Sequence, residues 1–288
     1  MGFSIALPQL KPTMNSITIY DGPSLFDGKR IIVVAVGFNN SSANTKTGGG
    51  VIQTFIMRAD INPFSALWEG KDTTVCGDCR HRSVKSGGMG TCYVNVAQSP
   101  LGVWKKWKAG GYPKATVGML GYFKDKIVRI GSYGDGAFVP INVWQTILSE
   151  AKGHLAYTHA WNHPNIDPKC KDIFMASTDS EAETNKARSM GWRTFHVRQE
   201  SDPILSREFV CPASLEAGSR LTCEKCGACN GGSFNRAEDG KFKIGRGTPT
   251  IIVHGMGWKV RRFAAVMKRV AQKKGWADLI PSKKVVKV

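Results

Sequence analysis

The stretch DIFMASTDSEAETNKARSMGWRTFHVRQ, residues 172–199, decides the fold of this chain. Its apolar beginning, 172–180, predicts a strand, and 181–191 predicts a helix that stops at a glycine. A second strand is predicted over 192–199. Strands that alternate with helices pair in parallel through right-handed crossovers, so the stretch predicts a βαβ unit of an α/β fold.

The same alternation continues on both sides of this unit. A helix is predicted over 139–153, and further strands are predicted over 126–136, 154–161, 208–214 and 248–255. Two earlier apolar runs, 31–37 and 51–57, predict a hairpin across a polar, glycine-rich loop. We expect a complete or partial (β/α) barrel-like sheet, with an open doubly wound sheet as the alternative.

The chain contains neither an internal repeat nor a clear linker, which predicts a single domain over 1–288. Its parts are the hairpin with a first cysteine loop (1–115), the β/α core (116–255), and a basic C-terminal helix and tail (256–288). The tail beyond 280 is predicted to be loose. No glycine-rich dinucleotide or phosphate loop follows any predicted strand, so those nucleotide-binding folds are not indicated.

Four of the eight cysteines fall between 211 and 229. Cys223, Cys226 and Cys229 form C-x2-C-x2-C, and Cys211 precedes a proline. Three closely spaced thiolates with a remote Cys-Pro are typical of [4Fe–4S] ligands, because the run wraps one face of the cluster and the fourth thiolate arrives from another element. Zinc is the rival, although four-cysteine zinc sites usually consist of two separated cysteine pairs.

A second group consists of Cys76, Cys79 and Cys92, which suits either an iron–sulfur cluster or zinc. The favoured fourth ligand is Cys170, with His81 as an alternative. If Cys170 completes the site, the role is structural or electron transfer. If it does not, one coordination position stays open for chemistry.

The N-terminus lacks the pattern of a signal peptide, and no segment approaches the roughly 20 apolar residues that span a bilayer. We therefore expect a cytoplasmic protein without membrane contact. Thiols stay reduced in that compartment, which favours metal ligation over disulfides for these cysteines.

Several motifs together resemble a family of poorly characterised bacteriophage proteins. They are VCGDCRHR, GTCYVNV, RIGSYGD, GHLAYTHAW, FMASTDS, GWRTFHVR and VCPAS with the following C-x2-C-x2-C, and the resemblance covers about residues 50–255. It implies a phage-encoded protein in the host cytoplasm. More distantly, cysteines ahead of a partial barrel resemble radical S-adenosylmethionine enzymes, whose C-x3-C-x2-C loop leaves one iron free. The spacing C-x2-C-x12-C departs from that motif.

Polar residues follow the predicted strands, where functional groups of (β/α) folds gather. They are Tyr133, Asp135, His159, Ser177, Asp179, Arg198 and His254. Tyr133, Asp135, His159 and Asp179 are the candidate catalytic residues, with His159 and one of the aspartates as an acid–base pair. The alternatives are structural: a helix N-cap for Asp179, a turn residue for Asp135 and a core histidine for His159.

The net charge of +18 predicts a polyanionic partner, with nucleic acid the commonest. Thirteen of the forty Lys and Arg residues lie after position 240, together with a single acidic residue. Within the amphipathic helix predicted over 258–276, the candidate phosphate contacts are Lys259, Arg261, Arg262, Lys268 and Arg269. A second candidate patch consists of Trp104, Lys105, Lys106, Trp107 and Lys108, where the tryptophans either stack on bases or pack in the core.

Three functions follow from these patterns. The first is a phage-type iron–sulfur or zinc protein that binds or processes nucleic acid through basic surfaces. The second is a radical S-adenosylmethionine-like metalloenzyme with an open [4Fe–4S] site. The third is a zinc-stabilised scaffold without catalysis. The expected cofactors are one or two [4Fe–4S] clusters, or alternatively zinc.

Overall fold

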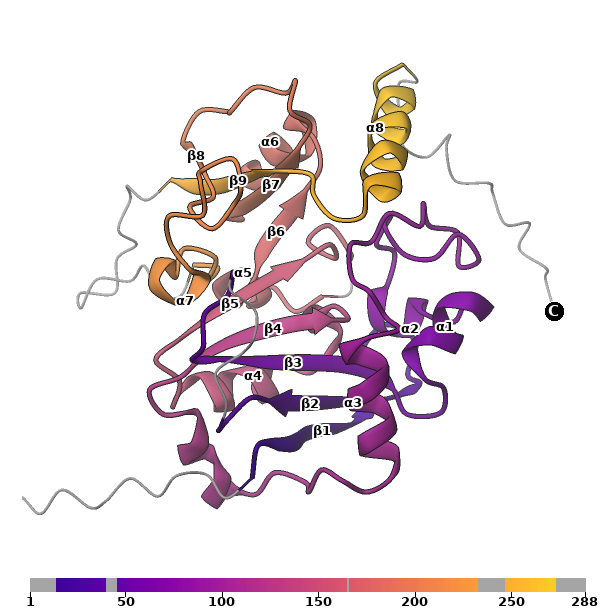
Figure 1. Ribbon diagram of the computed structural model, residues 1–288, viewed down its shortest axis with the longest axis vertical. Helices are drawn as coiled ribbons and strands as arrows, with labels where there is room; N and C mark the ends of the chain where they lie inside the picture. The colour runs from indigo at the N-terminus through magenta and orange to yellow at the C-terminus, as the bar shows by residue number, and fades with distance from the viewer. Residues whose placement is uncertain (1–13, 40–45, 165, 233–246, 273–288) are drawn as a thin grey trace, which may run out of the picture.

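A computed structural model describes residues 14–39, 46–164, 166–232 and 247–272 of the chain. Nine strands form one sheet in the order β1-β2-β3-β4-β5-β6-β7-β9-β8 (Figure 1). The α/β class predicted from the alternation of strands and helices is confirmed.

The first three strands are antiparallel. They are β1 (Ser16–Pro23), β2 (Arg30–Val36) and β3 (Val51–Arg58). The predicted pairing of 31–37 with 51–57 is confirmed by β2 and β3, whose apolar side chains are almost all buried. The edge strand β1 was not predicted as a separate strand, because its second half is only partly buried and its sequence lacks a sustained apolar pattern.

The remaining strands are parallel to their neighbours, as the alternation with helices predicted. They are β4 (Ile127–Tyr133), β5 (Gly153–Thr158), β6 (Met175–Thr178), β7 (Thr194–Arg198), β8 (Glu208–Val210) and β9 (Thr248–Ile252). The last strand, β9, lies between β7 and β8.

The sheet is open, with β1 and β8 as its edges, so the prediction of a complete barrel is wrong. A barrel would close by pairing the outer edge of the first parallel strand, β3, with the last one. That edge is already hydrogen-bonded to β2, and β1 extends the sheet further in the same direction. Strands β1 and β2 thus prevent the sheet from closing into a barrel.

Helices connect the strands and carry the cysteine loops. They are α1 (Pro63–Glu69), α2 (Thr73–Cys76), α3 (Ser99–Lys108), α4 (Ile141–Leu148), α5 (Cys170–Ile173), α6 (Glu181–Ser189), α7 (Cys223–Cys226) and α8 (Gly257–Gln272), with 3₁₀ helices η1 (Val117–Phe123) and η2 (Gly136–Phe138). The helices predicted over 139–153 and 181–191 are confirmed as α4 and α6. In the part of the chain described here, no helix has the length and apolar character to cross a bilayer.

The basic helix α8 packs against the rest of its own chain. Phe263 and Met267 are buried, and the Phe263 ring stacks on His81 with a centroid distance of 5.8 Å and an interplanar angle of 20°. The apolar face of the predicted amphipathic helix is therefore confirmed at these two positions, which lie one helical turn apart. Residues 273–288, including the predicted loose tail, lie outside the described ranges.

Candidate metal centre

A cavity of about 310 Å³ lies where the parallel strands end. Of the polar residues predicted at the strand ends, six line it: Tyr133, Asp135, His159, Ser177, Asp179 and His254. The seventh, Arg198, does not line it and instead forms an ion pair with Glu216. The carboxyl ends of parallel strands share one edge of a sheet, which is why residues far apart in sequence meet here.

Seven of the eight cysteines line this same cavity, as a group of three and a group of four. The three-cysteine group is Cys76, Cys79 and Cys92, and the four-cysteine group is Cys211, Cys223, Cys226 and Cys229. All eight cysteines are free thiols. The sequence separated these groups correctly, but it did not show that they face one another across one cavity.

The three-cysteine group lies on the loop that follows β3 and α2. The Cys79 amide donates to the Cys76 carbonyl at 3.1 Å, and the Cys92 amide donates to the His81 carbonyl at 2.9 Å. These bonds fold the twelve intervening residues back so that Cys92 returns to the first two cysteines. From α8, the Lys259 ammonium donates to the Cys92 carbonyl and ties the helix to this loop.

Two residues fix the shape of this loop from inside the protein. The guanidinium of buried Arg82 donates to the Cys79 carbonyl at 2.6 Å and to the Ser86 carbonyl at 3.2 Å. Gly77 has φ +53°, and a Cβ atom there would lie 2.3 Å from the Phe138 ring. Only glycine permits this close approach of the Cys76–Cys79 turn to the core.

Burial raises the pKa of each thiol in this group. The pKa of Cys76 is raised well above its ordinary value, that of Cys79 is also raised, and that of Cys92 rises to about 11. Without a cation the three side chains are therefore neutral thiols at physiological pH. A metal centre would bind them as thiolates and release their protons.

The four-cysteine group joins three separate parts of the chain. Cys211 follows β8 directly and its amide donates to the Thr250 carbonyl of β9 at 2.8 Å. Cys223 and Cys226 bound the short helix α7, and the Cys223 amide donates to the Lys46 carbonyl at 2.9 Å. Cys211 and the run of three cysteines line the same cavity, and their role as one ligand set stays a prediction.

Cys229 lies beside the part of β5 that is not paired with β6. Only the last two residues of β5 pair with β6, so the earlier part of β5 has an unpaired edge. The Ala156 amide on that edge donates to the Cys229 carbonyl at 2.9 Å. The Arg193 guanidinium holds this loop in place. It donates to Asn230 Oδ1 at 2.8 Å and to the Gly231 carbonyl at 2.6 Å. The cysteine loop thus gives β5 a hydrogen-bond partner at a residue that β6 does not pair with.

The structure does not place Cys170 with the three-cysteine group. It begins α5, ahead of β6, where it is 2% exposed within the main hydrophobic core. Burial raises its pKa to about 12, as expected for an inert core thiol. Since Cys170 does not line the cavity, the predicted fourth ligand is not supported, and three thiols remain for this centre.

The spacing that the thiols would need differs between a single ion and a cluster. Four thiolates around one zinc ion lie about 3.8 Å apart, because each Zn–S bond is about 2.3 Å long and the geometry is tetrahedral. Among the residues that the structure describes, no three cysteine sulfur atoms lie within 4.8 Å of one another. An iron–sulfur cluster accepts wider spacing, since each thiolate binds a different iron.

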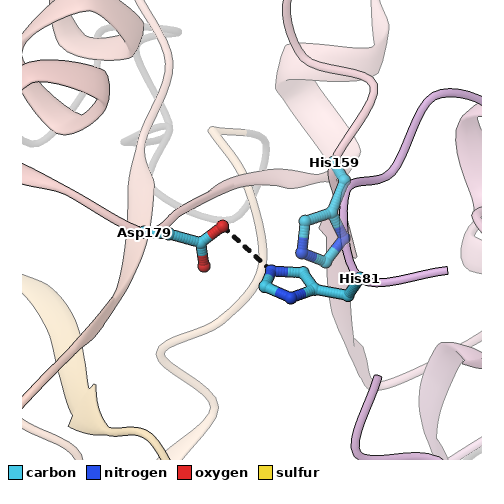
Figure 2. A group of neighbouring side chains, drawn as sticks. All are labelled: His81, His159 and Asp179. Atoms are coloured by element: carbon cyan, nitrogen blue, oxygen red, sulfur yellow. Dashed lines mark hydrogen bonds and ion pairs between the residues drawn. The ribbon is translucent and has the colours of Figure 1, made fainter. Parts of the chain in front are cut away.

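Beside the three-cysteine group, His81, His159 and Asp179 converge (Figure 2). His81 Nε2 lies 2.9 Å from Asp179 Oδ2, and the rings of His81 and His159 meet edge to face at a centroid distance of 5.2 Å. Burial disfavours the charged form of Asp179, but His81 and Arg80 together hold its pKa below the ordinary value. Asp179 is thus paired with His81, whereas the predicted acid–base partner was His159.

The structural alternative is wrong for Asp179 and is confirmed for Asp135, which caps a 3₁₀ turn. Ser180, rather than Asp179, caps α6, so the N-cap alternative for Asp179 is wrong. Asp135 caps η2 through the Ala137 amide, and its other oxygen accepts from the Thr158 hydroxyl at 3.0 Å and the His159 amide at 2.9 Å. Asp135 therefore holds the end of β5 and contacts the backbone of His159. Burial raises the pKa of this carboxyl.

One cavity residue that the sequence did not single out is Arg129. It lies in the middle of β4 and lines the cavity, and its guanidinium donates to the Tyr93 hydroxyl at 3.0 Å. A lone arginine inside an apolar strand carries no local motif, so only the tertiary structure identifies it. Tyr133, by contrast, was predicted at the strand end, and burial raises its pKa well above the ordinary value.

The two predicted basic surfaces differ in their surroundings. On α3, Lys105, Lys106 and Lys108 are exposed, but Trp104 and Trp107 pack against the main core. The Trp104 indole donates to the Arg58 carbonyl at 2.8 Å, which favours the core alternative over a stacking platform. On α8 the exposed basic residues are Arg261, Arg262, Lys268 and Arg269.

Comparison with known proteins adds no relative from which a function could be transferred. No protein-family model, no curated protein and no solved structure matches this chain. The resemblances to bacteriophage proteins and to radical S-adenosylmethionine enzymes therefore stay predictions, and the case for a function rests on the geometry of this cavity.

Proposed function

We propose that this protein is an iron–sulfur enzyme that binds a small molecule at an open [4Fe–4S] cluster held by Cys76, Cys79 and Cys92. The observation that carries the proposal is the division of the cavity thiols into three and four, with Cys170 elsewhere in the core. Three thiolates leave one iron of a four-iron cluster without a protein ligand. An open metal position beside a cavity is the requirement for chemistry.

The four-cysteine group supplies a complete ligand set, so its cluster would transfer electrons or stabilise the loops. Both clusters would border one cavity, which places the complete one near the open one. Strands β3 to β7 follow one another in order across the sheet, and the three-cysteine loop leaves the end of β3, the first of them. This order supports the partial-barrel resemblance to radical S-adenosylmethionine enzymes as an analogy only.

A reduced cluster bound there would supply a single electron to the sulfonium of S-adenosylmethionine, and cleavage of one sulfur–carbon bond would give methionine and an adenosyl radical. The residues of this chain would hold and shield the reactants. Phe263 and His81 cover one side of the cavity, and Arg129 and Tyr93 present hydrogen-bond donors on its lining.

The proposal is tested on full-length protein prepared without oxygen. We expect about eight iron and eight sulfide per chain, because the proposal requires two four-iron clusters. With dithionite as the electron donor and S-adenosylmethionine added, methionine and an adenosine product should accumulate. A colourless protein that contains about two zinc ions and cleaves nothing would instead establish the zinc-stabilised scaffold.

Nucleic-acid binding is the second candidate, and the exposed basic face of α8 favours it. Arg261, Arg262, Lys268 and Arg269 are exposed on a helix whose opposite face is anchored by Phe263 beside the cavity. Guanidinium and ammonium groups on a fixed helix suit phosphate contacts. A polyanion bound along α8 would lie next to the proposed open cluster, so it could also be the substrate.

We expect binding of single-stranded DNA or RNA to weaken steeply with salt. Changing the four exposed basic residues of α8 to glutamine should lower the slope of log affinity against log salt by about one unit for each phosphate that the variant no longer neutralises. The matched control changes Lys105, Lys106 and Lys108 of α3 to glutamine, which should have little effect. Affinity that is equally reduced by both sets would show that α8 has no special role.

A further inference from the structure

The three side chains in Figure 2 come from different segments and meet at one point of the cavity lining. His81 belongs to the loop after α2, His159 directly follows β5, and Asp179 directly follows β6. One ligand atom from each lies within 4.8 Å of the other two. This separation matches a shared ion, since ligand bonds of about 2.0–2.2 Å place neighbouring ligand atoms about 3–4 Å apart.

The hydrogen bonds of His81 argue against a simple acid–base role. Its Nε2 lies 2.9 Å from Asp179 Oδ2, and its Nδ1 lies 2.7 Å from the Thr91 hydroxyl. Thr91 thus orients the ring through Nδ1, and Nε2 faces the carboxylate of Asp179. In metal-binding histidines one nitrogen binds the ion while a neighbour orients the ring through the other, so an ion here would take the place of the proton between Nε2 and Asp179 Oδ2.

Asp179 provides an independent observation that points to a bound cation. Its side chain is 2% exposed, and its Oδ1 atom is buried without a hydrogen-bond partner among the described residues. A buried carboxylate oxygen without a partner is unfavourable, because it loses its hydration. A cation bound by this carboxylate would remove that penalty.

We propose that His81, His159 and Asp179 bind one divalent first-row transition-metal ion, such as Fe²⁺ or Zn²⁺. Two imidazoles and one carboxylate select these ions over Mg²⁺ and Ca²⁺, which prefer oxygen ligands. Three protein ligands leave coordination positions open towards the cavity, where an oxygen or nitrogen atom of a substrate binds. None of the three residues is a cysteine, so the site does not depend on the iron–sulfur proposal.

The test uses Mn²⁺ as the probe, because this ion has little affinity for thiolates and is observed directly by electron paramagnetic resonance. Full-length protein is titrated without oxygen, and we expect one bound Mn²⁺ per chain. His159→Gln should weaken this binding at least about 10-fold, since it removes one ligand. The His159 side chain is exposed, so the variant should keep the melting temperature of the parent.

Two further variants separate the site from non-specific histidine binding. Thr91→Val keeps the side-chain shape but removes the hydroxyl beside His81, and it should weaken Mn²⁺ binding about 10–100-fold. His163→Gln is the matched control, because its ring packs against Phe26 and Phe138 and does not line the cavity, and binding should not change.

Cys79→Ser distinguishes this inference from the iron–sulfur proposal. A variant that has lost cluster iron but still binds one Mn²⁺ would support the ion site by itself. The inference is overturned if the parent binds no Mn²⁺ at millimolar concentration, or if His159→Gln and Thr91→Val bind it as tightly as the parent.

Discussion

Cys79→Ser is expected to halve the iron content, from about eight to about four atoms per chain, and to abolish S-adenosylmethionine cleavage. Cys79 lies between the other two thiols of its group, on a turn held by Arg82. Two remaining thiolates cannot hold a four-iron cluster against loss in buffer. The measurements are elemental analysis, the visible spectrum and product formation, all without oxygen.

The matched control for this variant is Cys170→Ala, which removes a buried thiol that does not line the cavity. It should keep about eight iron atoms and full cleavage activity, and truncation of one core sulfur should cost about 1 kcal/mol of stability. If Cys79→Ser and Cys170→Ala lost iron equally, Cys170 would be a ligand of the cluster. The centre would then be closed, and the proposal of an open cluster would be wrong.

Cys211→Ser is expected to remove the other four iron atoms and to lower the free energy of unfolding by about 4 kcal/mol. The reason is structural: this group connects the end of β8, helix α7 and the edge of β5 that β6 does not pair with. Helix α7 has only four residues and cannot form without tertiary support. Because ligand binding and folding of such loops are coupled, loss of the cluster appears as loss of stability.

The effect of Cys211→Ser is measured as thermal unfolding together with iron content. A loss of about 4 kcal/mol should lower the melting temperature by roughly 10 °C in a chain of this size. Cys79→Ser should shift it much less, because hydrogen bonds from Arg82 hold its loop without the cluster. Equal destabilisation by both variants would contradict the division into one reactive and one structural centre.

Much of the fold was predictable because its signals are local. The strands and helices between 126 and 199 follow from apolar periodicity and glycine stops, and β4 to β7 with α4 and α6 confirm them. The cysteine run 223–229 was likewise recognisable, since its three thiols are two residues apart. The choice between a barrel and the open alternative was not decided by these local signals, because it depends on β2 covering the edge of β3.

The candidate site was only partly predictable for the same reason. The rule that functional residues follow parallel strands found six cavity residues correctly. It did not find Arg129, which has no motif around it, or the partner of Asp179, which is 98 residues away in the chain.

The sequence by itself determined the α/β class, the parallel pairing and the division of seven cysteines into two groups, because these depend on residues close together in the chain. Only the tertiary structure decided that both groups border one cavity, that Cys170 lies in the core instead, and that His81 meets Asp179. These contacts depend on the order of the strands in the sheet and on the edge of β5 that is not paired with β6, to which the Cys229 loop is hydrogen-bonded. Hydrogen bonds between segments that are distant in the chain determine the strand order and this unpaired edge, and no short stretch of sequence indicates them.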